Sequence, residues 1–246
     1  MVAFDQSDHA VIIYSGGMDS FTLLNDIVEQ LKHTGIKFHA LSFDYGQRHR
    51  KELDFAISVC DDLFKAGVNL SHVVINLKGL ASLLGGSALT DNSIPVPEGH
   101  YEDATMATTV VPGRNTIMLS MALGYAEALA NKDNSKVVVY YGAHSGDHAI
   151  YPDCRPSYIH AMQLVFLQSS EEKVALQAPY KHLTKGGILK IGLDLKLNYA
   201  CSWTCYKGEE HPCGVCGACT ERHEAFLENK ATDPWFPPLP FNNKGL

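Results

Sequence analysis

The chain has 246 residues, of which 46% are hydrophobic and 19% are charged, so we expect one folded core with a small appendage rather than an intrinsically disordered protein. The net charge of −7 gives no general attraction for nucleic acid or for anionic membranes, and we expect neither as a partner. No signal-peptide pattern and no apolar run of about 18 residues is visible, which predicts a soluble protein of the cytoplasm.

Short apolar runs alternate with amphipathic stretches along the first 200 residues. The run from His9 to Tyr14 predicts a strand that ends in Ser-Gly-Gly. Residues 21–31 then repeat their apolar positions at helical spacing, and Gly35 stands where that helix would end. Further strands are predicted at 37–43, 71–77, 136–141 and 174–178, and further helices at 52–65, 115–130, 158–168 and 184–195. This alternation predicts an α/β fold, with a parallel sheet flanked by helices on both faces.

Two stretches break the alternation. Residues 85–113 are rich in Gly, Ser, Pro, Asp and Thr, and a connection of that length is typical of a functional or mobile segment. Residues 231–246 are rich in proline, and we expect them to be extended. We therefore divide the chain into an α/β domain, residues 1–200, and a cysteine-rich module with its tail, residues 201–246.

The glycine turn after the first strand predicts an anion site. Gly16 and Gly17 allow a sharp turn, and the helix that follows directs its N-terminal N–H groups at one point. The hydroxyls of Ser15 and Ser20 add donors, whereas Asp19 would repel phosphate unless it holds a Mg²⁺ ion that bridges to the phosphates. The turn lacks the features of a Walker A loop and of a dinucleotide fingerprint. A serine-capped turn is the alternative, but the carboxyl end of a first strand favours ligand binding.

Five of the seven cysteines lie within residues 201–219. Four of them, spaced C-x7-C-x2-C-x2-C, predict a closed tetrahedral Zn²⁺ site with a structural role: Cys205, Cys213, Cys216 and Cys219. An iron–sulfur cluster is a weaker alternative, and Cys201 could replace Cys205. His211 and His223 lie nearby, but four sulfurs complete the site, so we interpret both as surface or helix histidines.

The turn S-G-G-M-D-S, residues 15–20, resembles the SGGxDS signature of the PP-loop ATP pyrophosphatases. Other phrases resemble the 7-cyano-7-deazaguanine (preQ0) synthase branch of that family, and they follow in its order from residue 11 to about residue 228: FDYGQRHRKEL, VPGRN, GAHSGDHAIYPDCRPSY, LTKGGI, SWTCY and CGVCGAC. Two departures are visible. The first cysteine gap is x7 where x8 is commoner, which requires a shorter loop, and SWTCY stands in place of TWSCY.

This resemblance implies an adenine-nucleotide α-hydrolase-like fold and an ATP-dependent, nitrile-forming ligase. ATP is split between its α and β phosphates to adenylate 7-carboxy-7-deazaguanine, ammonia gives the amide, and a second ATP activates the amide oxygen so that loss of AMP leaves the nitrile. The loop would hold the departing pyrophosphate, residues 44–48 would lie near the adenine and ribose, and the family suggests a homodimer. The resemblance implies the following ATP-binding residues: Tyr14, Ser15, Gly16, Gly17, Met18, Asp19, Ser20, Phe21, Thr22, Leu23 and Leu24.

Further polar residues are candidates for catalysis or substrate binding. Arg114 could bind phosphate or the substrate carboxylate in bidentate fashion, or be a solvent-exposed arginine at a helix start. Asp147 or Asp153 could accept the N–H pair of the deazaguanine edge, and His148 could carry protons, although a polar surface turn would have the same composition. We interpret Lys185 as a first-turn helix residue rather than a phosphate ligand. The predicted catalytic set is Asp19, Arg114, Asp147 and His148, and the predicted substrate-binding pair is Arg114 and Asp153.

Two other functions are alternatives. A PP-loop enzyme that acts on tRNA, such as a thiolase, would need a persulfide-bearing cysteine, for which Cys60 and Cys154 are available, but the acidic chain offers no basic domain. A non-catalytic zinc-ribbon adaptor would bind nucleotide without releasing pyrophosphate, and it would leave the other family phrases unexplained. Activity on a free deazapurine without RNA would distinguish the synthase from the tRNA-modifying enzyme. Release of pyrophosphate would distinguish it from the non-catalytic adaptor.

Overall fold

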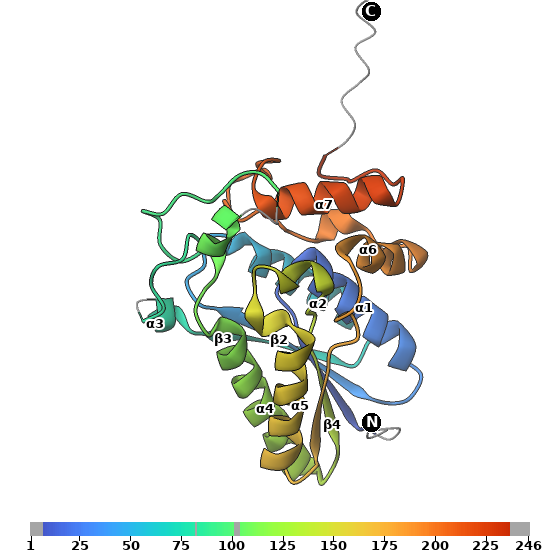
Figure 1. Cartoon of the computed structure of the whole chain (residues 1–246). Coiled ribbons are helices and arrows are strands. Elements are labelled where there is room, and N and C mark those ends of the chain that lie inside the picture. Colours follow the sequence, from blue (N-terminus) through green and yellow to red (C-terminus); the bar gives the residue numbers. More distant parts are fainter. Residues whose placement is uncertain (1–6, 82, 101–103, 237–246) are drawn as a thin grey trace, which may run out of the picture.

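One sheet with helices on both faces organises the chain (Figure 1). The computed structural model describes residues 7–81, 83–100 and 104–236. Within these ranges five strands form a sheet in the order β3-β2-β1-β4-β5, and every neighbouring pair is parallel. The strands are β1 (His9–Ile13), β2 (Lys37–Asp44), β3 (Leu70–Asn76), β4 (Val137–Tyr140) and β5 (Val174–Gln177). The predicted α/β class is confirmed.

Alternate residues of the central strand face opposite layers of helices, because successive side chains of a strand point to opposite faces. Ile12 lies in a buried cluster with residues of α1 (Met18–Leu31), α2 (Lys51–Lys65) and α6 (Lys185–Asp194). Val11 lies in the other cluster, with residues of α4 (Arg114–Asp133) and α5 (Pro156–Ser169). The sheet is therefore covered on both sides, as parallel sheets usually are.

The cysteine-rich module folds around a third buried cluster. Trp203 stacks on Phe55 of α2, with ring centroids 5.8 Å apart, and meets the ring of Trp235 edge-on at 5.5 Å. The module ends in α7 (Gly217–Glu228), whose Ala225 and Phe226 belong to the same cluster as the core of the sheet domain. The proposed division at residue 200 thus runs through packed side chains, and it stays a prediction.

The long connection of residues 85–113 lies against that module (Figure 1). Glu98 forms an isolated antiparallel bridge with Cys216, and the N–H of Gly99 donates to the carbonyl of Val215 at 3.0 Å. A short α3 (Lys78–Ala81) precedes the connection, and a 3-10 helix spans Ala104–Thr109 within it. The described part of the connection is therefore held by backbone hydrogen bonds to the module.

The boundaries of the predicted helices and strands match the structure to within a few residues, whereas the short α3 and the 3-10 helices are not predicted. Helix α7 is not among the predicted elements, because the cysteine spacing masks its periodicity. The described start of the tail is not extended: the N–H of Phe236 donates to the carbonyl of Asp233 at 3.1 Å and closes a turn. Residues 237–246 lie outside the described residues. None of the described helices is both long and apolar enough to cross a membrane.

Candidate active site

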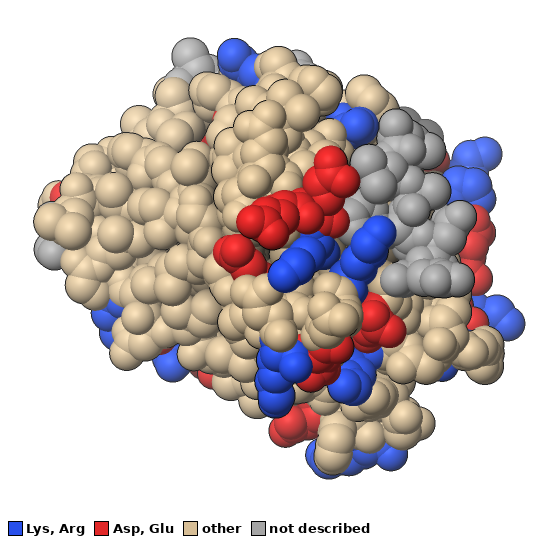
Figure 2. All heavy atoms as spheres, turned by 90° about the horizontal axis from the view of Figure 1, so that it is seen from below, with Lys and Arg blue, Asp and Glu red and all other residues tan. Residues whose placement is uncertain are grey.

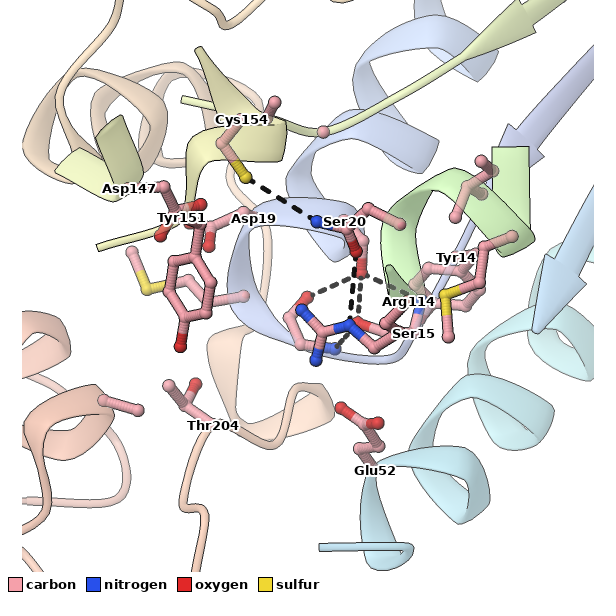
Figure 3. Close-up of a pocket in the computed structure, with 18 of the residues that line it drawn as sticks. Tyr14, Ser15, Asp19, Ser20, Glu52, Arg114, Asp147, Tyr151, Cys154 and Thr204 are labelled. Carbon is pink, nitrogen blue, oxygen red and sulfur yellow. Dashed lines mark hydrogen bonds between the residues drawn. The ribbon is translucent and has the colours of Figure 1, made fainter. Parts of the chain in front are cut away.

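A pocket of about 220 Å³ opens at the carboxyl ends of β1, β2 and β4, where parallel sheets commonly bind ligands (Figure 3). The glycine turn forms its floor, and the cysteine-rich module forms the opposite wall. Its lining combines aromatic side chains with a few charged ones, which is typical of small-molecule sites. The lining includes Ser15, Gly17, Asp19, Ser20, Tyr45, His49, Glu52, Arg114, Asp147, Tyr151, Cys154, Lys185, Trp203, Thr204 and Tyr206.

Internal hydrogen bonds hold the turn open. The N–H of Gly17 donates to the Oγ of Ser15 at 3.1 Å, and the two hydroxyls of Ser15 and Ser20 lie 3.0 Å apart. Ser20 also donates to the carbonyl of Gly17 and accepts from the N–H of Ser15. Helix α1 begins one residue after Gly17, so its N-terminus points into the pocket. A pre-formed turn at a helix N-terminus can hold an anion, because its N–H groups converge on one point.

Gly16 is required by its backbone and by its neighbours. Its φ is +89°, a conformation that favours glycine. A Cβ at this position would lie 2.1 Å from the carbonyl oxygen of Glu52, at the start of α2. The turn and the first turn of α2 are therefore in direct backbone contact, which places the Glu52 side chain beside the anion site.

Asp19 belongs to a buried chain of charges. The Nζ of Lys185 lies 3.2 Å from the Oδ2 of Asp19 and 2.6 Å from the Oε2 of Glu221, which α7 contributes. Burial opposes ionisation of Asp19, but Lys185 and His144 outweigh it and hold the pKa of this carboxyl well below its ordinary range. The Oδ1 of Asp19 is buried and has no hydrogen-bond partner among the described residues. Asp19 is thus a carboxylate with one oxygen left for a ligand.

His144 connects Asp19 with Asp147. Its Nε2 lies 3.5 Å from the Oδ2 of Asp19 and 3.4 Å from the Oδ2 of Asp147. Burial disfavours the imidazolium, yet the two carboxylates raise the pKa of His144 to about 9. Nε2 faces both carboxylates and carries a proton, whereas the N–H of Gly146, 3.1 Å from Nδ1, opposes a second proton on the ring.

The other end of the pocket holds Arg114. Its guanidinium donates to the hydroxyl of Tyr45 at 3.2 Å and to the side chain of Asn115 at 3.2 Å. Among the described residues no carboxylate forms an ion pair with it. Arg114 starts α4 after Gly113, whose φ is +65°, so the glycine turns the chain and aims the arginine inward. A guanidinium held by neutral groups is free to bind an anionic ligand.

Glu52 faces Arg114 across the pocket (Figure 3). The side-chain amide of Gln47 donates to its Oε1 at 3.2 Å, and the Nε2 of His49 lies 3.5 Å from the same oxygen. Burial raises the pKa of Glu52 to about 8, with smaller opposing effects from Gln47 and Arg114. A carboxyl group with such a pKa can exchange a proton near neutral pH.

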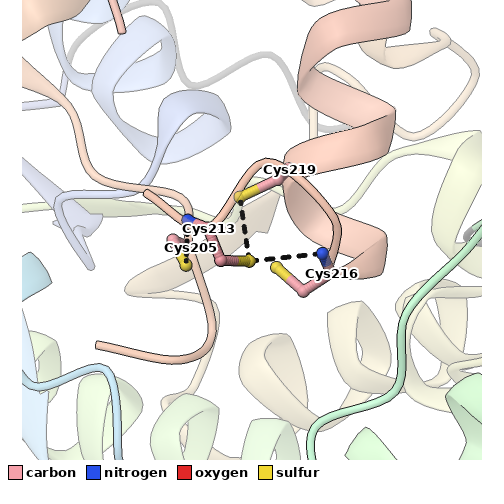
Figure 4. Close-up of side chains that lie close together, drawn as sticks. All are labelled: Cys205, Cys213, Cys216 and Cys219. Carbon is pink, nitrogen blue, oxygen red and sulfur yellow. Dashed lines mark hydrogen bonds between the residues drawn. The ribbon is translucent and has the colours of Figure 1, made fainter. Parts of the chain in front are cut away.

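The four predicted cysteines converge in the module (Figure 4). The sulfurs of Cys205, Cys213, Cys216 and Cys219 all lie within 4.8 Å of one another. The N–H of Cys213 points at the sulfur of Cys205, and the N–H of Cys216 points at the sulfur of Cys213. Four sulfurs at this spacing with backbone donors can hold one metal ion. Cys201 is not part of the group.

Arg222 ties the module together and to the pocket wall. Its side chain is 1% exposed, and the Nε and Nη2 of its guanidinium donate to the two carboxylate oxygens of Asp233 at 2.7 and 2.9 Å. The same guanidinium donates to the hydroxyls of Ser202 and Thr204 and to the carbonyl of Tyr199. The segment that lines the pocket is thereby fixed to α7.

The structure brings most of the predicted site residues together. The following line the pocket: Tyr14, Ser15, Gly17, Met18, Asp19, Ser20, Arg114 and Asp147. Phe21, Thr22, Leu23 and Leu24 are buried in α1 and point away from solvent. His148 and Asp153 lie in the same segment between β4 and α5 as Asp147, but they are not among the residues that line the pocket. The roles of all these residues stay predictions.

Other predictions resolve differently. Lys185 lies in the first turn of α6, as predicted, and it is also buried at the pocket, where it pairs with Asp19; its role towards phosphate stays a prediction. Within residues 44–48 only Tyr45 lines the pocket, while Asp44 pairs with Arg50 and Arg48 binds the connection at Asp91. His211 and His223 are exposed, as expected.

Sequence reasoning missed several residues of the site: Glu52, Trp203, Thr204 and Tyr206 line the pocket, and His144 and Glu221 contact Asp19 and Lys185 behind it. Most lie inside phrases that carry the family resemblance, which was the available signal. Neither spacing nor periodicity marks them, because they meet only through contacts between distant segments.

Comparison with known proteins identifies the family. A family model described as Queuosine biosynthesis protein QueC matches residues 9–230. The chain belongs to this family. A 7-cyano-7-deazaguanine synthase of Alteromonas mediterranea is 52% identical over 228 residues, which cover 93% of this chain and 98% of the relative. One of Marinomonas sp. is 51% identical over 229 residues, covering 93% and 97%. The resemblance expected from the sequence is confirmed.

A comparison of folds matches a more distant solved structure. It is described as the U34-tRNA thiolase NcsA from Methanococcus maripaludis with its 4Fe-4S cluster, with a TM-score of 0.41 and 12% sequence identity. The match covers 90% of this chain and 64% of that one, so the chain spans less than two thirds of the solved protein's length.

Proposed function

We propose that this chain is an ATP-dependent ligase that converts 7-carboxy-7-deazaguanine and ammonia into 7-cyano-7-deazaguanine, with release of AMP and pyrophosphate. The observation that carries the proposal is its relation to the QueC family: relatives named for that product share about half of all residues over almost their entire length. The pre-formed anion turn at the pocket floor supports ATP as the activating substrate.

ATP would bind with its phosphates over the turn and Mg²⁺ at Asp19. The unpartnered Oδ1 of Asp19 fits a cation ligand, since hard divalent cations prefer carboxylate oxygens. Magnesium would neutralise charge on the phosphates as pyrophosphate leaves. Lys185 holds Asp19 ionised and adds positive charge beside the turn.

The other candidates line or adjoin the remaining pocket. Arg114 would bind a phosphate or the substrate carboxylate, which its lack of a carboxylate partner among the described residues supports. Asp147 or Asp153 would accept the N–H pair of the deazaguanine, and His148 would carry protons. The buried Nε2 of His148 has no hydrogen-bond partner among the described residues, so a ligand could engage it.

The cysteine group would hold one structural Zn²⁺. Four cysteine ligands close a tetrahedral site and leave no position for water, so the metal would act on folding rather than on the reaction. Metal analysis of the purified protein should find about one zinc per chain and no iron–sulfur absorption.

The partners would be small molecules and a second copy of the chain in the cytoplasm. Phe64 of α2 is 66% exposed, and Val73 and Val74 of the edge strand β3 are also exposed, which supports self-association. On the face seen in Figure 2, acidic and basic side chains are interspersed, so this face presents no continuous basic patch of the kind that binds nucleic acid.

The test is a reaction of the protein with ATP, Mg²⁺, an ammonium salt and 7-carboxy-7-deazaguanine, without RNA, followed by mass spectrometry. We expect the nitrile, AMP and pyrophosphate. Asp19→Asn should lose most turnover and keep its fold and zinc content. Formation of ADP and orthophosphate, or no nitrile at all, would refute the proposal, and activity on tRNA alone would favour the thiolase alternative.

A further inference from the structure

The proposed reaction has an unmet chemical requirement, and the inference here rests on that function. In neutral water the nitrogen donor is mostly ammonium, which has no lone pair and cannot attack an acyl group. A proton must leave the nitrogen inside the pocket, close to the activated carbon. A group there must accept it, and its proton affinity must suit neutral pH.

Most titratable groups of the pocket are unsuited to this task. Asp19 is held ionised by its contacts with Lys185 and His144, and its pKa is low. The Nδ1 lone pair of His144 already accepts from Gly146, and its Nε2 carries the proton. Asp147 faces that Nε2 at 3.4 Å. The charged groups at this end of the pocket therefore pair with one another, and none of them is suited to accept the proton of ammonium.

The groups at the other end are unsuited for a different reason. Burial raises the pKa of Tyr45 to about 12, and burial also raises the pKa of Cys154 far above its ordinary value, so both keep their protons. Burial lowers the pKa of His49 to about 3, which makes its ring a weak base. Arg114 keeps its charge at any ordinary pH.

Glu52 has the geometry that the others lack. Its Oε1 is anchored by Gln47 at 3.2 Å, and among the described residues no hydrogen bond or ion pair engages Oε2. Its backbone touches Gly16, so the side chain projects into the pocket beside the phosphate turn (Figure 3). The pocket lining also includes the aromatic rings of Tyr45, Trp203 and Tyr206; the Nζ of Lys51 lies 4.4 Å from the centre of the Trp203 ring, which shows that a cation can sit on this wall.

We propose that Glu52 is the catalytic residue that binds ammonium and accepts its proton through Oε2. The N–H bond breaks, the proton passes to the carboxylate, and the nitrogen lone pair forms the C–N bond to the adenylated carbon. The C–O bond to AMP then breaks and AMP leaves with the electron pair. The nitrogen releases a second proton to solvent as the adduct collapses. Glu52 afterwards returns its proton to water.

The experiment compares two nitrogen nucleophiles in wild-type protein and in Glu52→Gln, which keeps the acceptor for Gln47. Hydroxylamine is largely neutral at pH 7 and needs no base before it attacks, and its product is a hydroxamate. With ammonium, Glu52→Gln should be slower by about 100-fold or more. Hydroxamate formation and substrate-dependent exchange of pyrophosphate into ATP should stay within about threefold of wild type.

The pH profile is the second readout. Because burial raises the pKa of Glu52 to about 8, its carboxylate form increases up to that pH. The groups that face it are His49, Tyr45 and the cationic Arg114, none of which titrates near pH 8. The wild-type kcat/KM for total ammonium should rise up to about pH 8 and level off above it, because Glu52 is then fully ionised. Glu52→Gln should follow free ammonia only.

Several results would overturn the proposal. Equal losses with both nucleophiles, or loss of pyrophosphate exchange, would make Glu52 a binding residue for ATP or substrate. Full activity of Glu52→Gln with ammonium would exclude it altogether. If circular dichroism shows that Glu52→Gln does not fold, Glu52→Asp takes its place in the test. Its shorter side chain holds the carboxylate farther from the substrate, so the reaction with ammonium should be slower and the reaction with hydroxylamine unchanged. Absence of nitrile and AMP in the wild type would instead refute the proposed function itself.

Discussion

The backbone N–H of Trp203 donates to the carbonyl of Gly16 at 3.0 Å. This hydrogen bond joins the cysteine-rich module to the glycine turn of residues 15–20, two segments almost 190 residues apart in the chain. The side chains of Trp203 and Thr204 also line the pocket. The module therefore completes the site, although its metal group would lie outside the reaction.

Loss of the metal group should consequently weaken ATP binding as well as stability. We expect Cys219→Ser to lose bound metal, to lower the melting temperature by several degrees and to raise the Kd for ATP. Cys201→Ser is the matched control, because Cys201 lies in the same module but outside the sulfur group. Metal analysis, thermal unfolding and nucleotide titration check this. Unchanged ATP binding in the metal-free protein would show that the module acts independently of the turn.

Substitution of Gly16 by alanine should lower the free energy of unfolding much more than the same substitution at another glycine with a similar positive φ. Gly16→Ala adds a Cβ that would meet the Glu52 carbonyl at 2.1 Å, whereas Gly35 has φ +80° with nothing within 4 Å. We expect Gly35→Ala to cost about 1 kcal/mol of unfolding free energy and Gly16→Ala about 2 kcal/mol more, with loss of activity. Urea unfolding of both variants measures the difference. Similar costs would mean that α2 moves aside easily.

Lys185→Met should destabilise the protein because it leaves Asp19 and Glu221 without their shared cation. Breaking such a buried pair costs about 3–5 kcal/mol. The exposed Lys190 on the same helix is the control, and Lys190→Met should change stability little. Chemical unfolding at pH 7 gives both values.

The ion pair of Asp19 and Lys185 predicts how the free energy of unfolding depends on pH. Because the pKa of Asp19 is lowered in the folded state, its contribution is present above the ordinary pKa of aspartate and is lost as pH falls through the folded value. Wild type and Lys185→Met should thus converge in stability at strongly acidic pH. A constant difference down to that range would contradict the assigned ion pair.

Glu52→Gln should make the protein more stable at alkaline pH. The pKa of Glu52 is raised to about 8, so folding is favoured by the protonated form and stability falls as pH rises from the ordinary pKa of glutamate to about 8. The neutral amide avoids this loss, and we expect a gain of about 1–3 kcal/mol at pH 9 that vanishes near pH 4. Urea unfolding at both pH values tests it. Equal stability at pH 9 would mean that the carboxylate is well solvated.

Much of the fold follows from local patterns. Strand β1 and helix α1 are visible in the sequence because a continuous apolar run before the turn gives way to apolar residues at helical spacing after it. Helix α7 is hidden because Cys216 stands at its N-cap and Cys219 in its first turn, where their spacing is typical of a metal site rather than of a helix start. The turn at Asp233 combines a local hydrogen bond, from the N–H of Trp235 to the Asp233 carboxylate, with the ion pair to the buried Arg222, which only the tertiary structure supplies.

The sequence by itself determined the glycine turn, the four cysteines and the family, since each depends on residues close together in the chain. Only the tertiary structure decided that Lys185 is buried against Asp19, that Glu52 faces Arg114, and that Trp203 closes the pocket. Burial and long-range contact set the charge and position of these side chains, and neither can be read from neighbours in the sequence.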